Sequence, residues 1–514
     1  MKTNKKIINI GAAVLAGGLG TRMKTEDPKA LSVLLENPLI FYAVESLITA
    51  RKDFNVRRGN SNFRILLDKI VTVVGHKGGL VKKYVSEEKR FKKKGLFLDF
   101  AEQEKYLGTA DAALKAADMF PRGSKETHIL ILPCDMPLIT SETLAETIKF
   151  HLGEGNDLTV LSAEAQEPYS YGRILKDGKG FVEKIAEEKE LCDYPPETSK
   201  IKEINSGVYV ARLSLFKKFI GLIKPDNRKK EYYLTDIVNI FYKAGLKTAC
   251  FKSPRGEEFA GVNSKPDLMS AQKIMQKRII AGLMEKGVNF ISDDSVYIGA
   301  NVKIGERAVI YPGVFISGNT FISKGVTIEN GSVVKDSFIA DGSRIKSYCV
   351  LENAFVMNGV QVGPFARLRP EVLLMEGSKI GNFVEVKKSV IGRNSKASHL
   401  SYIGDAMIGD NANIGAGVIT CNYDGRKKHM TVIGDGCFIG SDSQLVAPVN
   451  IGKNSYVGSG TTVTKDVPEG ALALSRTPQR NIEGWALKKA KERPEKGRKP
   501  EAKERAAKGK GVKK

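Results

Sequence analysis

The sequence has few of the residues that build metal clusters and disulfide frameworks. Of 514 residues, only six are cysteine and five are histidine. The cysteines form no CxxC pair and no cluster with histidine; they are Cys134, Cys192, Cys250, Cys349, Cys421 and Cys437. This scattering argues against a zinc site or a disulfide framework and fits a reducing cytoplasm. The chain also lacks any run of about 18 apolar residues, so we predict no membrane-spanning segment.

Acidic residues are in short supply relative to basic ones. Lys and Arg total 81 against 58 Asp and Glu, a formal net charge of +23. Such a charge points first to nucleic acid or a membrane surface as a partner. Residues 488–514 alone hold 13 basic and 4 acidic residues, a local charge of +9, and no aromatic residue. We predict a disordered basic tail there, and the lack of aromatic rings for base stacking argues against nucleic acid as a main partner.

Residues 1–268 alternate β-type apolar runs with helical patterns. This alternation predicts an α/β domain with a mostly parallel sheet. Strands are expected at residues 7–15, 70–75, 96–100, 128–132, 158–163, 208–211 and 248–251, and helices at 39–50, 109–119, 141–150 and 233–244.

The first apolar run has two interpretations. Lys5-Lys6 followed by residues 7–16 has the basic start and apolar core of a secretory signal. The run leads at once into the glycine-rich segment 17–22, which favours a buried strand entering a functional loop. Two further segments are connections: residues 51–64 are expected to form a basic surface insertion, and residues 269–287 a linker helix that stops at Gly287.

From residue 296 the sequence repeats every six residues. One series comprises Ile298, Ile304, Ile310, Ile316, Ile322, Ile328 and Val334, and the period recurs as far as Val463. No helix or hairpin strand has this period, which is typical of a parallel β-helix with aliphatic residues stacked inside. We predict such a domain over residues 288–487. Residues 421–430 interrupt the repeat, and loops expelled from a solenoid are frequent sites of function.

A glycine-rich loop, Gly17-Gly18-Leu19-Gly20, follows the first predicted strand. Glycines let backbone N–H groups approach a phosphate, and Arg22 and Lys29 add positive charge. This loop with its later Pro-Lys resembles the signature of sugar-1-phosphate nucleotidyltransferases. Mg²⁺ prefers oxygen ligands, and Asp135 at a strand end is a suitable ligand, with a helix N-cap before Met136 as its alternative role.

Further motifs extend the resemblance to about residues 8–487. They lie at 103–110, 134–138, 171–174, 185–189, 203–207, 231–236 and 261–263 in the first domain, and at 363–370, 382–388, 398–404, 411–415 and 420–425 in the β-helix. Together they resemble the bifunctional N-acetylglucosamine-1-phosphate uridylyltransferase / glucosamine-1-phosphate N-acetyltransferase of bacteria. The resemblance implies a Rossmann-like α/β nucleotidyltransferase domain followed by a left-handed β-helix of hexapeptide repeats, assembled as a homotrimer.

The resemblance also implies the reactions. Glucosamine-1-phosphate would be acetylated with acetyl-CoA as co-substrate, and N-acetylglucosamine-1-phosphate would then receive uridylyl from UTP with release of pyrophosphate. The product, UDP-N-acetylglucosamine, serves peptidoglycan and lipopolysaccharide synthesis. The chemistry fits the residues, because uridylyl transfer needs positioning and charge neutralisation, and amine acetylation needs a general base.

For the first domain, the resemblance implies a set of substrate-binding residues and a Mg²⁺ site held by Asp135 and Asn263. The binding residues would be Leu15, Ala16, Gly17, Arg22, Lys29, Gln103, Gly108, Thr109, Gly172, Glu187, Asn205 and Asn263. The sequence departs from the family pattern at three positions. Leu19 stands where the family usually has Lys, Asp111 where it has His, and Cys134 where it has Gly.

For the β-helix, the resemblance implies that His399 is the general base, supported by Asn422, with Glu385 assisting. Histidine suits this task because its unperturbed pKa is near 6.5, although an isolated histidine would be interpreted as structural. Glucosamine-1-phosphate would bind Arg369, Lys387, Tyr402, Asn413 and Tyr423, and acetyl-CoA would bind Ala416, Ser441, Ser459 and Arg476. The alternative is a single-activity nucleotidyltransferase with the β-helix as a trimerisation scaffold. The presence of His399, Asn422 and Arg476 argues against it.

Overall fold

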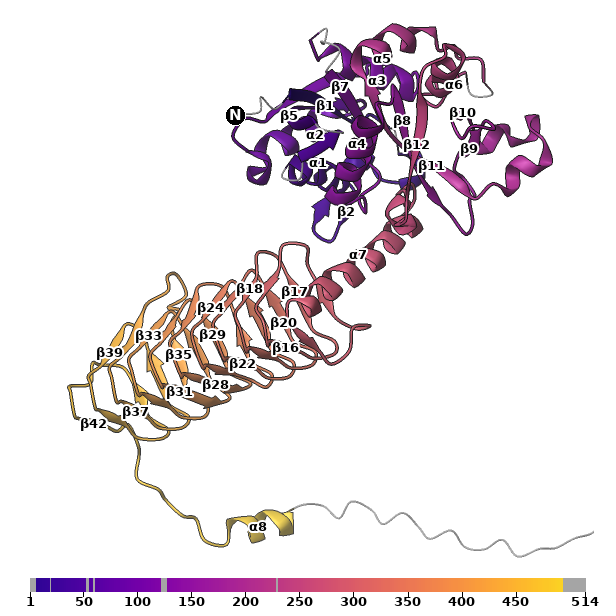
Figure 1. Ribbon diagram of the computed structural model, residues 1–514. Coiled ribbons are helices and arrows are strands. Elements are labelled where there is room, and N and C mark those ends of the chain that lie inside the picture. The colour runs from indigo at the N-terminus through magenta and orange to yellow at the C-terminus, as the bar shows by residue number, and fades with distance from the viewer. Residues whose placement is uncertain are drawn as a thin grey trace, which may run out of the picture.

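The computed structural model describes residues 6–18, 20–51, 55–58, 61–121, 127–227 and 230–492. An α/β domain comes first, a single long helix follows, and a triangular prism of short strands completes the chain before a last short helix (Figure 1). None of the described helices is long and apolar enough to cross a membrane.

The N-terminal sheet is built around β1 (Lys6–Ala16). This strand pairs in parallel with β5 (Ser61–Val74) and β7 (Thr127–Pro133), and β5 pairs in parallel with β6 (Phe97–Glu102). The first apolar run is therefore a central strand, as favoured over a secretory signal.

The expectation of a mostly parallel sheet is wrong for the other half of the sheet, where antiparallel pairs occur. β11 (Glu203–Arg212) runs antiparallel to both β7 and β8 (Leu158–Glu164), while β12 (Thr248–Ser253) is parallel to β8. Between β8 and β11 the chain makes the hairpin of β9 (Arg173–Lys176) and β10 (Val182–Ala186) instead of a helical crossover. A parallel partner needs such a crossover, so β11 returns antiparallel and the sheet is mixed.

Helices cover both faces of this sheet. α1 (Leu39–Ala50), α2 (Gly78–Glu87) and α4 (Ser141–Glu154) contribute to one buried apolar cluster. α3 (Thr109–Asp118), α5 (Leu213–Phe219) and α6 (Asp236–Lys243) contribute to the other. β1 serves both clusters because alternate side chains point to opposite faces of a sheet: Ala12 and Val14 join the first cluster and Ala13 the second.

The predicted insertion at 51–64 extends the sheet. β4 (Asn55–Arg58) pairs antiparallel with residues 61–64 at the start of β5. The basic segment therefore forms a β-hairpin at the sheet edge, and β5 begins nine residues earlier than the strand predicted at 70–75.

A single helix, α7 (Lys265–Glu285), leads to the β-helix and begins four residues before the predicted 269–287. Its start is fixed by a capping box: the Ser264 hydroxyl accepts from the Asp267 N–H, and the Asp267 carboxylate accepts from the Ser264 N–H. Midway along the helix, the Gln276 side chain donates to the Ile298 carbonyl (2.6 Å) and accepts from the Ile298 N–H (2.9 Å).

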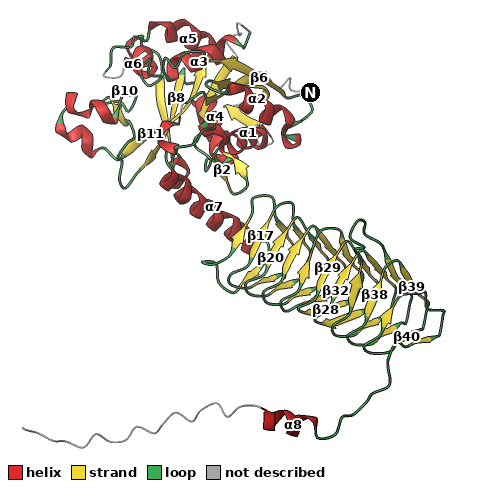
Figure 2. Cartoon of the chain, turned by 180° about the vertical axis from the view of Figure 1, so that it is seen from behind, coloured by secondary structure: helices red, strands yellow, loops and turns green. Residues whose placement is uncertain are grey.

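The prism is a β-helix with three parallel sheets of 11, 10 and 9 strands (Figure 2). They run from β13 (Asn289–Phe290) to β42 (Leu472–Ala473), from β14 (Tyr297–Ile298) to β41 (Thr462–Val463), and from β15 (Lys303–Ile304) to β39 (Val449–Ile451). Each strand pairs in register with the strand one coil later.

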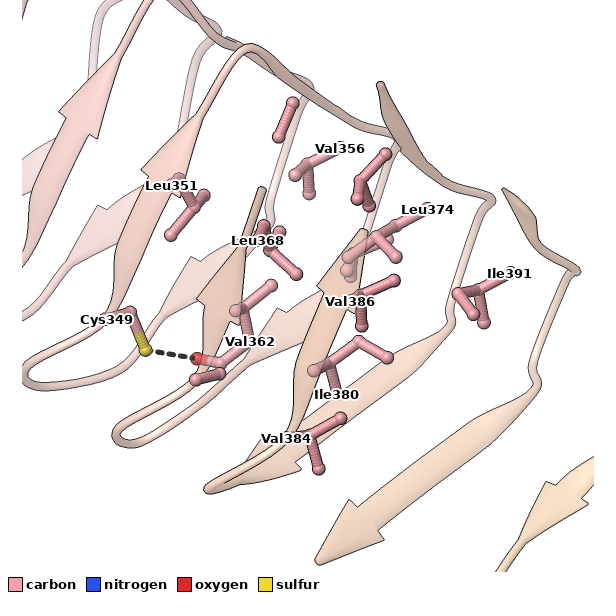
Figure 3. Packing of buried hydrophobic residues seen from close by; sticks show 14 of the residues in the cluster. Cys349, Leu351, Val356, Val362, Leu368, Leu374, Ile380, Val384, Val386 and Ile391 are labelled. Atoms are coloured by element: carbon pink, nitrogen blue, oxygen red, sulfur yellow. Dashed lines mark hydrogen bonds between the residues drawn. The ribbon is translucent and has the colours of Figure 1, made fainter. Parts of the chain in front are cut away.

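The interior of the prism is filled by the aliphatic residues of the six-residue period. Leu351, Leu368 and Val386 stack on one another in register and are fully buried (Figure 3). These stacks account for the predicted period, since every sixth residue is the inward side chain of the next face. The interruption at 421–430 lies between β35 (Ile419–Cys421) and β36 (Thr431–Ile433), where the chain leaves the coil.

The predicted disordered tail at 488–514 is partly corrected. α8 (Trp485–Glu492) continues through residues 488–492, where Ala, Lys and Glu are good helix formers. The remainder, residues 493–514, lies outside the described residues.

A buried histidine pair joins the start of β7 to α4. His128 on β7 and His151 on α4 are joined through Nδ1 and Nε2 at 2.9 Å, and His151 Nδ1 contacts the Thr159 hydroxyl at 2.8 Å. Burial, and secondarily the charge of Arg212, lowers the pKa of His128 to about 4. Burial, the partner imidazole and Arg212 also lower the pKa of His151.

We predict acid sensitivity of this domain. The unfolded histidines take up protons near pH 6.5 and the folded ones do not, so stability is complete above pH 6.5 and falls as the pH drops toward 4. Between pH 7 and pH 5, the free energy of unfolding should therefore fall by about 2 kcal/mol less in the His128→Gln variant than in the wild type. Scanning calorimetry at several pH values measures it. The exposed His76→Gln variant is the control, and equal slopes for all three proteins would contradict the prediction.

Candidate functional sites in the two domains

The glycine-rich loop lies where parallel strands β1 and β7 end. Gly17 is buried against the next strand, since a Cβ added there would lie 3.0 Å from Gln103 Oε1. Gly20 takes the left-handed conformation (φ 61°), and a Cβ there would approach the Lys29 side chain to 2.6 Å. The loop therefore needs glycine at both positions to pass this closely over its neighbours. Leu19 lies outside the described residues.

Oxygen atoms and cations converge beside this loop. Lys29 Nζ donates to Asp135 Oδ2 at 2.5 Å and to Asn263 Oδ1 at 2.9 Å. Arg22 Nη2 donates to the same Asn263 oxygen at 3.1 Å. The Lys29 side chain is only 10% exposed, so its ammonium is held in a largely dry position. Asp135 and Asn263, far apart in sequence, thus lie together with Arg22 and Lys29.

The Asp135–Asn263 pair fits a Mg²⁺ ion. Both donors are oxygens, and both already point at one cation, the Lys29 ammonium. Within the described parts of the chain, no group of three or more His, Cys, Asp or Glu could hold a metal. A site with so few protein ligands suits Mg²⁺, which usually binds one or two protein oxygens plus substrate phosphates.

Leu15, Ala16 and Cys134 form the floor of the site. The Cys134 N–H donates to the Leu15 carbonyl at 3.1 Å, which ties the end of β1 to the segment after β7. Burial raises the pKa of the Cys134 thiol to about 12, so the thiol stays neutral. Cys134 therefore replaces glycine as an inert filling residue.

A second group of predicted residues surrounds Gln103. Its side-chain Nε2 donates to the Gly108 carbonyl (3.0 Å) and to Asp111 Oδ2 (2.8 Å). Gly108 has φ 122°, and a Cβ there would meet the Tyr232 carbonyl oxygen at 2.4 Å. The Thr109 hydroxyl accepts from the Leu234 N–H at 3.0 Å.

The predicted sugar-binding residues lie on the β9–β11 side. The Asn205 N–H donates to the Gly172 carbonyl at 2.9 Å, and Asn205 Nδ2 donates to the Tyr209 hydroxyl at 2.9 Å. The Glu187 carboxylate accepts from the Thr235 hydroxyl at 2.9 Å. These bonds fix each side chain at the rim of the sheet.

The predicted acetyl-transfer residues lie on neighbouring coils of the β-helix. His399 at the end of β31 (Lys396–His399) pairs with Asn382 at the end of β28 (Lys379–Asn382). His399 Nδ1 lies 2.7 Å from Asn382 Oδ1. An amide oxygen can only accept, so Nδ1 carries the hydrogen and Nε2 keeps its lone pair. This is the form in which an exposed imidazole can take a proton.

Asn422 is held from below by a buried carboxylate. Its Nδ2 donates to Asp405 Oδ2 at 2.6 Å, and both residues are buried. The interrupting loop that follows is closed by Asp424, whose carboxylate accepts from the N–H groups of Arg426 and Lys427 and contacts His429.

Positive charge gathers beside these groups. The ammonium of Lys428 in the loop comes within hydrogen-bonding reach of Lys387 and lowers the pKa of Lys387, with burial and Arg369 acting in the same direction. Arg369 Nη1 donates to Glu385 Oε1 at 3.0 Å, and Tyr402 pairs with Glu385 across adjacent coils. Crowded cations of this kind are relieved by a bound anion such as phosphate.

The remaining predicted residues lie on coils further along. Asn413 pairs with Lys396, and Tyr423 is exposed in the loop. The Ala416 carbonyl accepts from Asp442, the Ser441 carbonyl accepts from Gly460, and the Arg476 guanidinium lies over Gly458, where a Cβ would be 2.7 Å from it. Ser441, Ser459 and Arg476 are exposed on the single chain.

Three residues beside these groups escaped the sequence reasoning: Asn382, Asp405 and Lys428. Asn382 precedes His399, and Asp405 precedes Asn422, by the same 17 residues. One coil of the β-helix spans that distance, so the supporting residue lies directly beneath each side chain. Three steps of the six-residue period give 18 residues, so the period predicts each supporting residue to within one position.

Family models match both halves of the chain. A MobA-like NTP transferase domain matches residues 12–189, a GlmU-like C-terminal hexapeptide matches 313–382, and a bacterial transferase hexapeptide of six repeats matches 430–465. The fold thus defines a nucleotidyltransferase joined to a left-handed β-helix transferase domain.

Full-length relatives identify the family. The chain is 42% identical to the bifunctional protein GlmU of Thermodesulfovibrio yellowstonii, over 93% of this chain and 99% of the relative. It is 43% identical to those of Thermoanaerobacter pseudethanolicus (93% and 98% covered) and Geotalea uraniireducens (94% and 99%). The chain belongs to the bifunctional GlmU family, with uridylyltransferase and glucosamine-1-phosphate acetyltransferase activities.

We predict that Mg²⁺ can replace the Lys29 ammonium. Lys29→Met leaves the Asp135 carboxylate without its cation and the Asn263 oxygen with Arg22 alone, at a cost of about 1–3 kcal/mol. Millimolar Mg²⁺ should restore part of this stability and should raise the melting temperature of the variant more than that of the wild type. The double variant Lys29→Met/Asp135→Asn is the control and should not respond. A Mg²⁺ response that is the same in all three proteins would contradict the assignment.

Proposed function

We propose that each activity belongs to one of the two groups described above. Residues 1–268 transfer uridylyl from UTP to N-acetylglucosamine-1-phosphate, and residues 288–487 acetylate glucosamine-1-phosphate, with 269–287 as linker and 488–514 as a basic tail. The observation that carries the proposal is the presence in one chain of both constellations: the Lys29–Asp135–Asn263 triad, and a β-helix that carries both His399 with Nδ1 bonded to Asn382 and the cation cluster of Lys387, Lys428 and Arg369.

In the first reaction, a phosphate oxygen of the sugar phosphate attacks the α-phosphorus of UTP, and pyrophosphate leaves. The negative charge of the reactants must be neutralised for them to approach. Lys29 and Arg22 supply fixed positive charge, and the loop at Gly17 supplies backbone N–H groups. Mg²⁺, held by Asp135 and Asn263, would add Lewis-acid neutralisation of phosphate oxygens. Gln103, Gly108 and Thr109 contact base and ribose; Gly172, Glu187 and Asn205 bind the amino sugar.

In the second reaction, the amine nitrogen attacks the thioester carbonyl of acetyl-CoA, and coenzyme A leaves as the thiol. His399 takes the proton from the amine through Nε2, because Nδ1 is already committed to Asn382. Asn422, fixed by Asp405, supports this step, and Glu385 assists in polarising the amine. Arg369, Lys387, Tyr402, Asn413 and Tyr423 bind the sugar phosphate, and Ala416, Ser441, Ser459 and Arg476 bind acetyl-CoA.

The β-helix also supports a homotrimer. A stripe of outward apolar residues runs along one sheet of the prism; it comprises Phe321, Phe338, Phe355, Leu373, Val390, Met407 and Val432. Phe355 and Met407 are each 49% exposed on the single chain. Monomeric proteins rarely expose so long an apolar stripe. The open position of His399 and Arg476 fits a site completed by a neighbouring chain. A cytoplasmic location agrees with six cysteines that form no disulfide in the described part of the chain.

We predict that the two activities separate by single substitutions. Purified protein given glucosamine-1-phosphate, acetyl-CoA, UTP and Mg²⁺ should release both free thiol and pyrophosphate. His399→Ala removes the base and should lower thiol release at least about 100-fold, while pyrophosphate release from pre-acetylated sugar is unchanged. Asp135→Asn should give the reverse pattern.

Loss of both activities in His399→Ala would contradict separate sites. Absence of thiol release in the wild type, with intact pyrophosphate release, would favour the single-activity alternative with a scaffold β-helix.

We predict that charge on the apolar stripe dissociates the trimer. Phe355→Glu with Met407→Glu should change the sedimenting species from three 56.2-kDa chains to one, and acetyl transfer should fall while uridylyl transfer persists. The control carries Thr327→Glu and Gln361→Glu on the polar outer face of another sheet. A wild-type monomer, or a double variant that stays trimeric, would refute this interface.

A further inference from the structure

Gln103 is held by two acceptors inside the first domain. It follows β6, its backbone N–H donates to the Val74 carbonyl at 2.8 Å, and its side chain is almost completely buried. Nε2 donates both to Asp111 Oδ2 at 2.8 Å and to the Gly108 carbonyl at 3.0 Å. A primary amide has two N–H donors and one acceptor oxygen. Both donors are therefore used within the protein.

The acceptor oxygen faces the nucleotide loop. A Cβ added to Gly17 would lie 3.0 Å from Gln103 Oε1, so the glycine is what leaves this oxygen open toward the loop. In the part of the chain that the structure describes, no donor is bonded to Oε1. A nucleotide base at this loop thus meets a Gln103 that can accept a hydrogen bond and cannot donate one.

This restriction distinguishes pyrimidine bases by one hydrogen atom. Uracil and thymine carry a hydrogen on N3, which can donate to Oε1. The N3 of cytosine carries a lone pair instead, which would face the lone pairs of Oε1. With cytosine bound, the buried Oε1 would have no hydrogen-bond donor. A binding site discriminates strongly against a ligand that leaves a buried polar group unpaired.

Asp111 is the side chain that enforces the restriction. An ionised carboxylate has no hydrogen to donate, so it pairs only with the Nε2 end of the amide. Without Asp111, one Nε2 hydrogen has no acceptor within the protein. The Gln103 amide can then rotate while it keeps its hydrogen bond to the Gly108 carbonyl, and it can donate the free hydrogen to N3 of cytosine.

We propose that Asp111 is a specificity-determining positioning residue that orients Gln103 so that the enzyme selects bases with an N3 hydrogen. The proposal rests on the proposed uridylyltransferase function of the same site. It assigns Asp111 no contact with the nucleotide; the residue acts through Gln103 alone.

The experiment compares kcat/KM for UTP, CTP and dTTP in pyrophosphate release. In Asp111→Ala the UTP/CTP ratio should fall about tenfold, chiefly through KM. The UTP/dTTP ratio should stay within about twofold, because both bases carry the N3 hydrogen. Asp111→Asn still offers an oxygen acceptor and should keep the UTP/CTP ratio within about threefold of the wild type.

Two controls separate this effect from damage to the fold. Asp118→Ala changes an exposed carboxylate at the other end of α3 and should leave every ratio unchanged. Thiol release at the His399 site should be the same in all variants.

An unchanged UTP/CTP ratio in Asp111→Ala would overturn the proposal, as would an equal fall in Asp111→Asn. Calorimetric dissociation constants for UTP and CTP report the same preference without turnover. If the wild type bound UTP in preference to CTP but released no pyrophosphate, the proposed function would fail and the role of Asp111 would stand.

Discussion

Parallel strand pairing decides where both groups of functional residues lie. In the first domain, β1 and β7 run in the same direction, so their carboxyl ends meet at one edge and bring the glycine loop to Asp135. In the β-helix, each strand pairs in register with its equivalent one coil later, so a side chain rests on the residue about 17 positions before it. The same constraint thus gathers residues distant in sequence in one domain and stacks them in the other.

The two domains are joined close to the first site. Asn263, which contacts Lys29 and Arg22, donates its backbone N–H to Asp267 in the capping box of α7. The helix therefore begins two residues after a candidate metal ligand. A second connection follows Lys29: the turn between β2 (Val33–Leu34) and β3 (Asn37–Pro38) places Glu36 against the β-helix, where it accepts from the Gly318 N–H at 2.8 Å. Both connections tie the surroundings of the first site to the β-helix.

Much of this architecture could be predicted from the sequence, because the six-residue period and the strand–helix alternation are properties of consecutive residues. The glycine loop, Asp135 and His399 were found because their residue types are tied to chemistry. The antiparallel return of β11 was missed, since it depends on the β9–β10 hairpin taking the place of a helix. The role of Lys29 as a bridge between Asp135 and Asn263 was also beyond reach, because 106 and 234 residues separate the partners. Asn382 and Asp405 can be predicted only if residues one coil apart are taken to be in contact.

The central claim is that one chain holds two independent catalytic sites, and complementation tests it most directly. Separately purified His399→Ala and Asp135→Asn proteins are mixed with glucosamine-1-phosphate, acetyl-CoA, UTP and Mg²⁺, and UDP-N-acetylglucosamine is quantified by chromatography. Each protein alone should form almost none. The mixture should form UDP-N-acetylglucosamine at a rate near that of wild type at half the total protein concentration. The reason is that the acetylated sugar phosphate passes through solution from one protein to the other. A mixture as inactive as either protein alone would contradict the account.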